Sequence, residues 1–392
     1  MQKTWRWFGE KDLVRLDQMR QIGVEGVVTS LHHKLPGELW TIEDIQAVQK
    51  KIEANGMIWS VVESLPVSEE IKQAGPKCKA HLEAYRQSLE NLAACGIRTI
   101  CYNFMPVLDW IRTDLEYTLP NGTQTLYFSW VEFAYFDVYV LKRAGARADY
   151  SVDLMKQVDE YASQATEETD QRLIYIIIIK TQGFVNGPLG NITGDPLVVF
   201  RQFLDQYASL TKADLRNNLV AFLTDIMPVC DAHDIHMCIH PDDPPYPVLG
   251  LPRIVSSTED IDWLLQAVDN VHNGLTFCAG SLSAGIHNDT VEMAKRFVHR
   301  THFAHLRSCD ILPNRDVVEA NHTLGRGQVA ELVRIFETQA PHIPMRVDHA
   351  PTLLDDIGKP YNAGYSLYGR MMALGQIEGM MAMVHNDKRS KG

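Results

Sequence analysis

The sequence of 392 residues predicts a single (β/α)8 barrel, in which eight parallel strands alternate with helices. Three observations predict this fold. Short apolar runs alternate with amphipathic helical patterns through residues 4–104, and the alternation resumes after residue 235. Together the two regions supply eight strand–helix alternations. Four runs in the last third also end on side chains that bind metals, as expected where parallel strands end at one side of a sheet.

The first four strands are predicted at residues 4–8, 24–30, 57–62 and 98–104. Three helices separate them, with apolar faces formed by Leu13, Leu16 and Met19, by Ile42, Ile45, Val48 and Ile52, and by Leu82, Tyr85, Leu89 and Leu92. Thr41 is the expected cap of the second helix. Gly23, Gly56 and Gly96 follow the three helices and end them.

Residues 105–230 are too many for one crossover between strands, so we expect an insertion that is mostly helical and caps the barrel mouth. Its first part is rich in aromatic residues, and residues 183–196 form a turn-like stretch. Residues 174–179 read as a buried strand by propensity, which would raise the strand count to nine. A short apolar run does not distinguish a strand from a buried helix, so both alternatives stay open at this point.

The last four strands are predicted at residues 236–240, 275–278, 302–306 and 345–348. The helices between them have apolar faces formed by Ile261, Leu264, Leu265 and Val268, by Val291, Ala294 and Phe297, and by Val329, Leu332, Val333 and Phe336. A closing helix is expected over residues 366–385. We therefore expect one barrel domain over residues 1–392, with residues 105–230 inserted in it.

The last four predicted strands end on His240, Cys278, His305 and Asp348, at steps of 38, 27 and 43 residues. Each step is about one strand–helix unit, which takes roughly 30 residues or more, so the four side chains should meet at the end where barrel enzymes keep their active sites. A lone Cys or His is usually structural. The joint pattern instead predicts a divalent metal site, and thiolate and imidazole favour Zn, Fe or Mn over Mg or Ca. Other histidines are assigned to structural or surface roles: His233, His236, His299 and His302.

Residues next to the expected ligands supply candidates for catalysis. His349 adjoins Asp348, and a base beside a Lewis acid is a productive arrangement, although adjacent strand residues face opposite ways. Tyr365 offers a phenolic acid on a Gly-containing loop, where packing is the alternative role. Arg307 either clamps a substrate carboxylate or pairs with a structural acid.

Composition limits the partners. The formal net charge of −12 excludes nucleic acid as an expected partner, while a metal and a few arginines still permit a small anionic substrate. Seven cysteines without a Cys-x-x-Cys pair indicate free thiols in a reducing compartment. No apolar signal core or run of about 20 apolar residues is present, so we expect a cytoplasmic protein without a membrane partner.

Several segments closely resemble the mannonate dehydratases, metal-dependent lyases of hexuronate (glucuronate) breakdown in the xylose-isomerase-like barrel superfamily. The resemblance runs nearly end to end. The segments that carry it include WRWFG at 5–9, WSVVES at 59–64, YNFMP at 102–106, HPDDPP at 240–245, GLPRIVS at 250–256, Asp348-His349 and Gly364-Tyr365-Ser366. The chain departs from the family pattern around residues 174–190, 319–328 and 350–351. These departures leave open which aldonate is preferred.

The resemblance implies dehydration of D-mannonate to 2-dehydro-3-deoxy-D-gluconate, with Mn²⁺ or Fe²⁺ held by the four expected ligands and eight barrel strands instead of nine. It also implies proton transfer by His349 and Tyr365. We expect Arg112, Arg307 and Asn103 to bind the sugar acid, and the chain to form a homo-oligomer, in particular a dimer. Two alternatives are a sugar isomerase or epimerase of the same superfamily and a sugar-acid-binding relative without catalysis.

Overall fold

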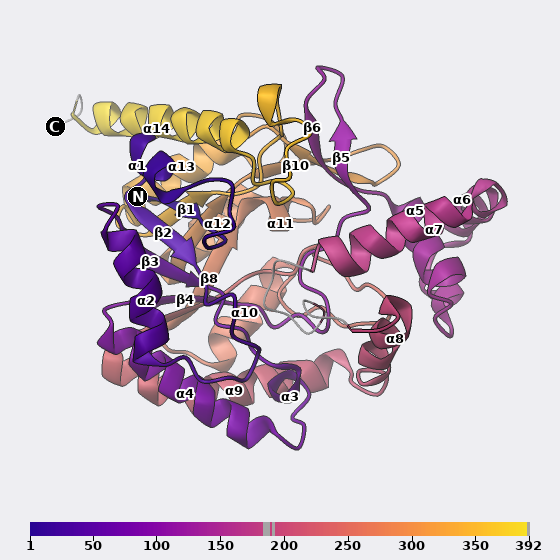
Figure 1. The fold of residues 1–392 in the computed structure, drawn as a ribbon, viewed down its shortest axis with the longest axis horizontal. Coiled ribbons are helices and arrows are strands. Elements are labelled where there is room, and N and C mark those ends of the chain that lie inside the picture. The colour runs from indigo at the N-terminus through magenta and orange to yellow at the C-terminus, as the bar shows by residue number, and fades with distance from the viewer. Residues whose placement is uncertain (183–188, 190–192, 390–392) are drawn as a thin grey trace.

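The computed structural model describes residues 1–182, 189 and 193–389, and eight parallel strands in it close into a barrel (Figure 1). The barrel strands are β1 (Gln2–Arg6), β2 (Gly26–Thr29), β3 (Ile58–Glu63), β4 (Thr99–Tyr102), β7 (His236–Ile239), β8 (Asn273–Cys278), β9 (Thr301–Leu306) and β12 (Pro344–Val347). Their order around the barrel follows the chain, and β1 pairs in parallel with both β2 and β12. The predicted (β/α)8 barrel is confirmed.

Helices surround the strands (Figure 1). They are α1 (Leu16–Gln21), α2 (Ile42–Glu53), α3 (Glu69–Lys72), α4 (Cys78–Ala94), α9 (Lys212–His233), α10 (Thr258–Ala267), α11 (Ala279–Ser283), α12 (Thr290–Phe297), α13 (Val329–Gln339) and α14 (Leu367–Arg389), with short 3-10 turns η4 (Val298–Arg300) and η5 (Leu354–Asp356). Thr41 caps α2 as predicted, because its side chain accepts a hydrogen bond from the backbone N–H of Asp44. Among the described residues, no helix is both long and apolar enough to cross a membrane.

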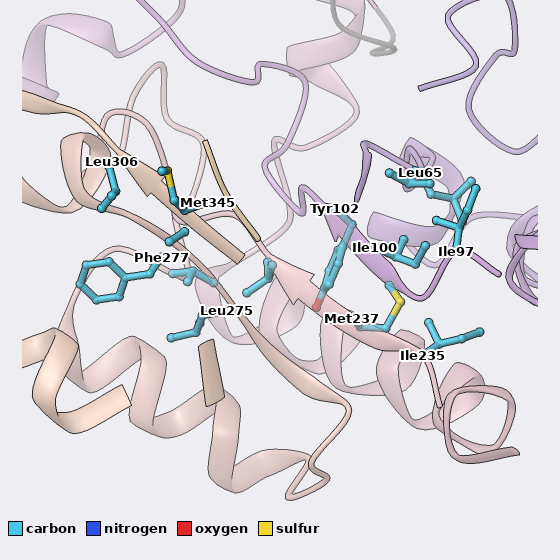
Figure 2. Packing of buried hydrophobic residues seen from close by; sticks show 14 of the residues in the cluster. Leu65, Ile97, Ile100, Tyr102, Ile235, Met237, Leu275, Phe277, Leu306 and Met345 are labelled. Carbon is cyan, nitrogen blue, oxygen red and sulfur yellow. The ribbon is translucent and has the colours of Figure 1, made fainter. Parts of the chain in front are cut away.

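Side chains alternate along the strands between the barrel interior and the helix layer. Met237 and Phe277 belong to the large core cluster that includes the surrounding helices, and Figure 2 shows them with their neighbours. Cys238 and Phe303 belong instead to a small cluster of five residues from five different strands, which fills the barrel interior. His240 and His305 lie two residues beyond Cys238 and Phe303, so strand alternation also directs them inward.

The insertion contains a hairpin that the sequence analysis did not predict. Its strands β5 (Asp114–Thr118) and β6 (Gln124–Phe128) join β11 (Val317–Ala320) and β10 (Ser308–Ile311) in a four-stranded antiparallel sheet, in the order β10-β11-β6-β5. Two of these strands lie after β4 in the chain and two after β9. A sheet formed across so long a separation has no local signal in either segment.

The rest of the described insertion is helical, as expected. It comprises α5 (Trp130–Tyr135), η1 (Phe136–Val140), η2 (Ala146–Asp149), α6 (Val152–Gln164), α7 (Glu167–Ile174), η3 (Tyr175–Lys180) and α8 (Pro196–Asp205), and α5, α6 and α7 extend to one side of the barrel in Figure 1. Residues 174–179 are helical, so the nine-strand alternative is wrong. The apolar run is explained by burial of a helix, because Ile177 and Ile178 lie in a second hydrophobic cluster. The predicted turn at 183–196 lies largely outside the described residues.

Candidate metal centre and active site

Three of the four predicted metal ligands lie together at the carboxyl ends of the strands. His240 follows β7, Cys278 ends β8 and His305 lies in β9, and one ligand atom of each is within 4.8 Å of the others. Asp348 follows β12, and its Oδ2 lies 3.8 Å from Cys278 Sγ and 3.6 Å from His305 Nδ1. The structure thus brings together a sulfur, two imidazoles and a carboxylate that are far apart in the chain.

The charge state of this cluster suits a cation. Burial raises the pKa of the Cys278 thiol, but the Arg307 guanidinium and the His240 imidazole lower that pKa well below its usual range. Burial also raises the pKa of Asp348, and Arg346, His349 and Arg307 hold it well below its usual range. The site therefore offers a thiolate and a carboxylate as ligands.

Two imidazole nitrogens are arranged as metal ligation requires. His240 Nδ1 lies 2.7 Å from the carbonyl oxygen of Pro241, so Nδ1 keeps its hydrogen and a bound ion would replace the proton on Nε2. His305 is fully buried, and its Nδ1 has no hydrogen-bond partner among the described residues. A buried nitrogen without a partner costs stability, and a bound cation would supply the partner. On both observations the residues fit a divalent ion.

Ion pairs hold the site from behind. Arg307 Nε donates to Asp348 Oδ2 at 2.8 Å, and its Nη2 donates to Asp243 Oδ2 at 2.5 Å. Arg346 Nη1 donates to the other oxygen of Asp348 at 2.6 Å, and its Nη2 lies 3.0 Å from Glu63 Oε1. Both arginines are buried and paired with Asp348 and at least one further acid, which fixes the Asp348 carboxylate toward the cluster.

His349 faces the same cavity as Asp348, because the chain leaves the strand pattern after β12. Its Nδ1 lies 2.9 Å from Glu319 Oε1, and its ring packs 5.2 Å from the ring of Trp110 and edge-on to Tyr365. Gly364 makes room for this ring, since an added Cβ would lie 2.9–3.0 Å from His349 atoms and its φ is +79°. An imidazole held by a buried carboxylate is oriented as a general base requires.

Tyr365 points its hydroxyl at the same carboxylate as Arg346. The hydroxyl donates to Asp348 Oδ1 at 3.2 Å, and Arg346 Nη1 lies 3.4 Å from it. Burial raises the pKa of Tyr365, so the phenol keeps its proton at neutral pH. His349 and Tyr365 are thus two proton-carrying groups whose ring centroids lie 5.0 Å apart beside the candidate metal centre.

Of the three predicted substrate-binding residues, two line the cavity and one does not. Arg307 and Asn103 line the cavity, and Asn103 donates to Asp109. Arg112 is not among the lining residues: its Nη1 donates to Asp243 Oδ1 at 2.7 Å and its Nη2 to Glu319 Oε1 at 2.5 Å. Direct contact of Arg112 with a substrate stays a prediction, and in the structure its guanidinium supports two acids.

Several residues that line the cavity were not among the predicted site residues. Arg6 ends β1 and Glu63 ends β3, so applying the strand-end rule to the first strands would have found both. Arg346 precedes Asp348 by two residues and shares its face, which is also a readable signal. Lys72 lies in the short helix α3, and no local pattern marks it. Glu319 does not line the cavity, and its contact with His349 in the structure identifies it.

Comparisons with known sequences identify the family of the chain. A sequence model described as D-mannonate dehydratase (UxuA) matches residues 1–391. A mannonate dehydratase of Chromohalobacter salexigens is 43% identical over 389 residues, covering 97% of this chain and 98% of the relative. A second, from a Marinomonas species, is 42% identical over 394 residues, with 97% and 98% coverage.

Solved structures give the same result for the fold. A mannonate dehydratase from Streptococcus suis serotype 2 superposes with a TM-score of 0.77 at 28% identity, covering 99% of this chain and 94% of that one. A D-tagatose 3-epimerase-like protein, with a TM-score of 0.52 at 8% identity over 99% of both chains, shares the fold alone. The lyase reading is therefore supported over the isomerase and the non-catalytic alternatives. The chain belongs to the D-mannonate dehydratase (UxuA) family, a family of hydro-lyases.

Proposed function

We propose that this chain removes water from D-mannonate to give 2-dehydro-3-deoxy-D-gluconate. The observation that carries the proposal is one cavity lined by His240, Asp348, His349 and Tyr365, with Cys278 and His305 behind it. Family membership names the reaction class, and the resemblance supplies the sugar acid. The cavity supplies the groups that such a reaction needs: candidate ligands for a cation, a base and an acid.

His240, Cys278, His305 and Asp348 would hold the metal, for which we propose Mn²⁺ or Fe²⁺. When bound, such an ion supplies electrostatic stabilisation for the negative charge that develops on substrate oxygens during loss of the C2 proton. A thiolate with two imidazoles favours a transition ion over Mg or Ca. Arg307 and Arg346 keep the Asp348 carboxylate ionised and aimed at the cluster.

His349 takes the proton from C2, and Tyr365 gives its phenolic proton to the hydroxyl that leaves C3. The C2–H and C3–O bonds break, a C2–C3 double bond forms, and the resulting enol becomes the 2-keto acid while water departs. Glu319 stabilises the imidazolium that forms on His349, because its carboxylate faces Nδ1 at 2.9 Å. The reverse assignment, with Tyr365 as base and His349 as acid, uses the same geometry.

Arg307 and Asn103 bind the substrate carboxylate and hydroxyls in this proposal, and Arg112 supports them through Asp243. Arg6 is a further candidate anchor. Its Nη1 is buried without a hydrogen-bond partner among the described residues and lies 3.9 Å from Glu63 Oε2. A buried guanidinium nitrogen directed at a cavity is suited to an anionic ligand. The helical insertion acts as the cap over this mouth in the proposal.

The test is a keto-acid assay on metal-analysed protein. With Mn²⁺ or Fe²⁺ added, D-mannonate should yield a 2-keto acid that reacts with semicarbazide, faster than D-gluconate or D-altronate. The variant His349→Asn should keep the metal and lose roughly 10²- to 10⁴-fold in kcat, whereas the exposed control His342→Asn should keep full activity. Absence of keto acid from every aldonate, in protein shown to carry metal, would overturn the proposal.

We also propose a cytoplasmic enzyme, because all seven cysteines are free thiols. A homodimer is the proposed assembly, and light scattering on purified protein measures it directly.

A further inference from the structure

Three histidines lie close together at the amino-terminal ends of the barrel strands, opposite the candidate active site. His236 begins β7, His272 immediately precedes β8, and His302 is the second residue of β9. The ring centroids of His236 and His272 are 5.1 Å apart, and those of His236 and His302 are 4.6 Å apart. His236 and His302 were predicted to have structural or surface roles, because they lie at strand starts.

Strand geometry directs these rings toward one another. His236 precedes Cys238 by two residues, so it shares the inward face of β7. Between β8 and β9, Leu275 pairs with Thr301 while Thr276 pairs with Phe303, which leaves His302 as an extra residue in β9. A bulge of this kind re-aims a side chain that regular alternation would direct outward.

Gly274 supplies the space for the re-aimed ring. A Cβ on Gly274 would lie 2.4 Å from both Cδ2 and Nε2 of His302, and 2.3 Å from the backbone oxygen of Arg300. The His302 ring therefore occupies the volume that a side chain in β8 would take. A bulge in one strand and a glycine in the next together place a third imidazole beside the other two.

Each ring presents a nitrogen without a partner. His236 Nδ1, His272 Nδ1 and His302 Nε2 are all buried, and none has a hydrogen-bond partner within the described part of the chain. Three such atoms in one cluster are unusual, because buried polar atoms in native proteins are nearly always satisfied.

Carboxylates complete the cluster. Asp234, at the end of α9, places Oδ1 3.8 Å from His236 Nε2, and ligand atoms of Asp234, His236 and His272 lie within 4.8 Å of one another. Asp231 Oδ1 lies 3.8 Å from His272 Nε2 and suits the role of a carboxylate that orients a metal-bound imidazole. The nearby cation Arg300 is engaged by the backbone oxygens of Asn270 and Asn273 and by Asp269.

We propose that Asp234, His236 and His272, with His302 as the fourth donor, form a second binding site for a divalent transition ion of the Zn²⁺ class. Three imidazoles and a carboxylate satisfy the tetrahedral preference of Zn²⁺. The ion joins the end of α9 to three adjacent strands, at the face of the barrel that serves stability and not catalysis. It binds the folded chain only, so it raises the melting temperature.

Cobalt titration tests this site without reference to activity. Metal-free full-length protein should bind two Co²⁺ ions per chain. The ion at Cys278 should give a thiolate-to-cobalt charge-transfer band, and the second ion should give only weaker d–d bands of a nitrogen and oxygen site. Cys278→Ser should bind one ion without the charge-transfer band, and Zn²⁺ should still raise its melting temperature.

The double variant His236→Gln/His272→Gln should bind one Co²⁺ ion, with the charge-transfer band intact, and keep wild-type turnover. His299→Gln is the matched control, because His299 is an exposed histidine in the adjacent turn η4, and it should bind two ions. A wild-type stoichiometry of one ion, all of it showing the thiolate band, overturns the proposal. The wild-type measurement needs no substitution, so a poorly folded variant does not remove the test.

Discussion

Replacing Glu319 with glutamine tests whether a buried carboxylate positions the catalytic imidazole. Glu319 Oε1 lies 2.9 Å from His349 Nδ1, 2.5 Å from Arg112 Nη2 and 3.1 Å from Arg307 Nη1. Burial raises the pKa of Glu319, but His349, Arg307 and Arg112 lower it to about 2, so the group is an anion at any working pH. Glu319→Gln keeps the shape and removes the charge.

The structure sets the expected size of the effect. The amide has one oxygen for three donors, and its nitrogen cannot accept from His349 Nδ1. An imidazole that accepts at Nδ1 carries its proton on Nε2 and cannot take another from C2. General base catalysis contributes roughly 10²- to 10⁴-fold, so we expect kcat to fall by at least about 100-fold, or about 2.7 kcal/mol of barrier.

The effect on stability should be smaller. Arg112 keeps Asp243 at 2.7 Å, and Arg307 keeps both Asp243 and Asp348. Glu319→Gln therefore leaves no cation without an acid, and we expect a loss of about 1–3 kcal/mol in the free energy of unfolding. The metal content should not change, because Glu319 is not one of the proposed ligands.

Steady-state kinetics, metal analysis and urea unfolding measure the effects on kcat, metal content and stability separately. Asp137→Asn is a matched control, because Asp137 is equally buried and pairs with Arg143 in the insertion, away from the cavity. We expect the control to lose stability and to keep kcat. Unchanged kcat in Glu319→Gln would refute the positioning role, and loss of bound metal with kcat would show that Glu319 acts through the metal centre.

Three further predictions follow from single contacts. Cys278→Ser should lose the ion held at the active-site cluster and more than about 100-fold in activity, because a hydroxyl replaces a thiolate there; metal analysis and the keto-acid assay measure both. Gly274→Ala should lower the free energy of unfolding by about 1–3 kcal/mol in urea, since its Cβ would meet a backbone oxygen at 2.3 Å, and an unchanged midpoint would contradict the steric argument. Burial raises the pKa of Cys230 to about 12, above its unfolded value of about 8.5. Its stability contribution is complete below pH 8.5 and is lost as pH rises toward 12, so Cys230→Ala should show a shallower decline in unfolding free energy between pH 8.5 and 10.5 than the wild type.

Much of the barrel could be predicted from the sequence, because its elements carry local signals. Apolar runs and helical spacings marked all eight strands, and Thr41 marked the start of α2. The order of parallel strands then placed their carboxyl ends together, which is why the four residues His240, Cys278, His305 and Asp348 could be grouped from spacing alone. The structure places them together, and their role as ligands stays a prediction.

Contacts between distant segments could not be read in this way. The sheet that pairs residues 114–128 with 308–320 depends on packing across almost 200 residues, and neither segment has a pattern that names its partner. Residues 174–179 show the same limit. Their run of isoleucines fits a strand by propensity. In the structure the run is helical, and Ile177 and Ile178 are buried in the core of the insertion.

The sequence by itself determined the barrel and the residue types at the ends of its strands, because period and spacing are local properties of a chain. Tertiary structure alone decided that Glu319 holds His349, that Arg112 supports acids behind the cavity, and that a bulge turns His302 toward His236. Each of these contacts joins charged groups or rings that are distant in the chain and buried together. In a buried space, the neighbouring groups determine how a side chain is oriented and whether it is protonated.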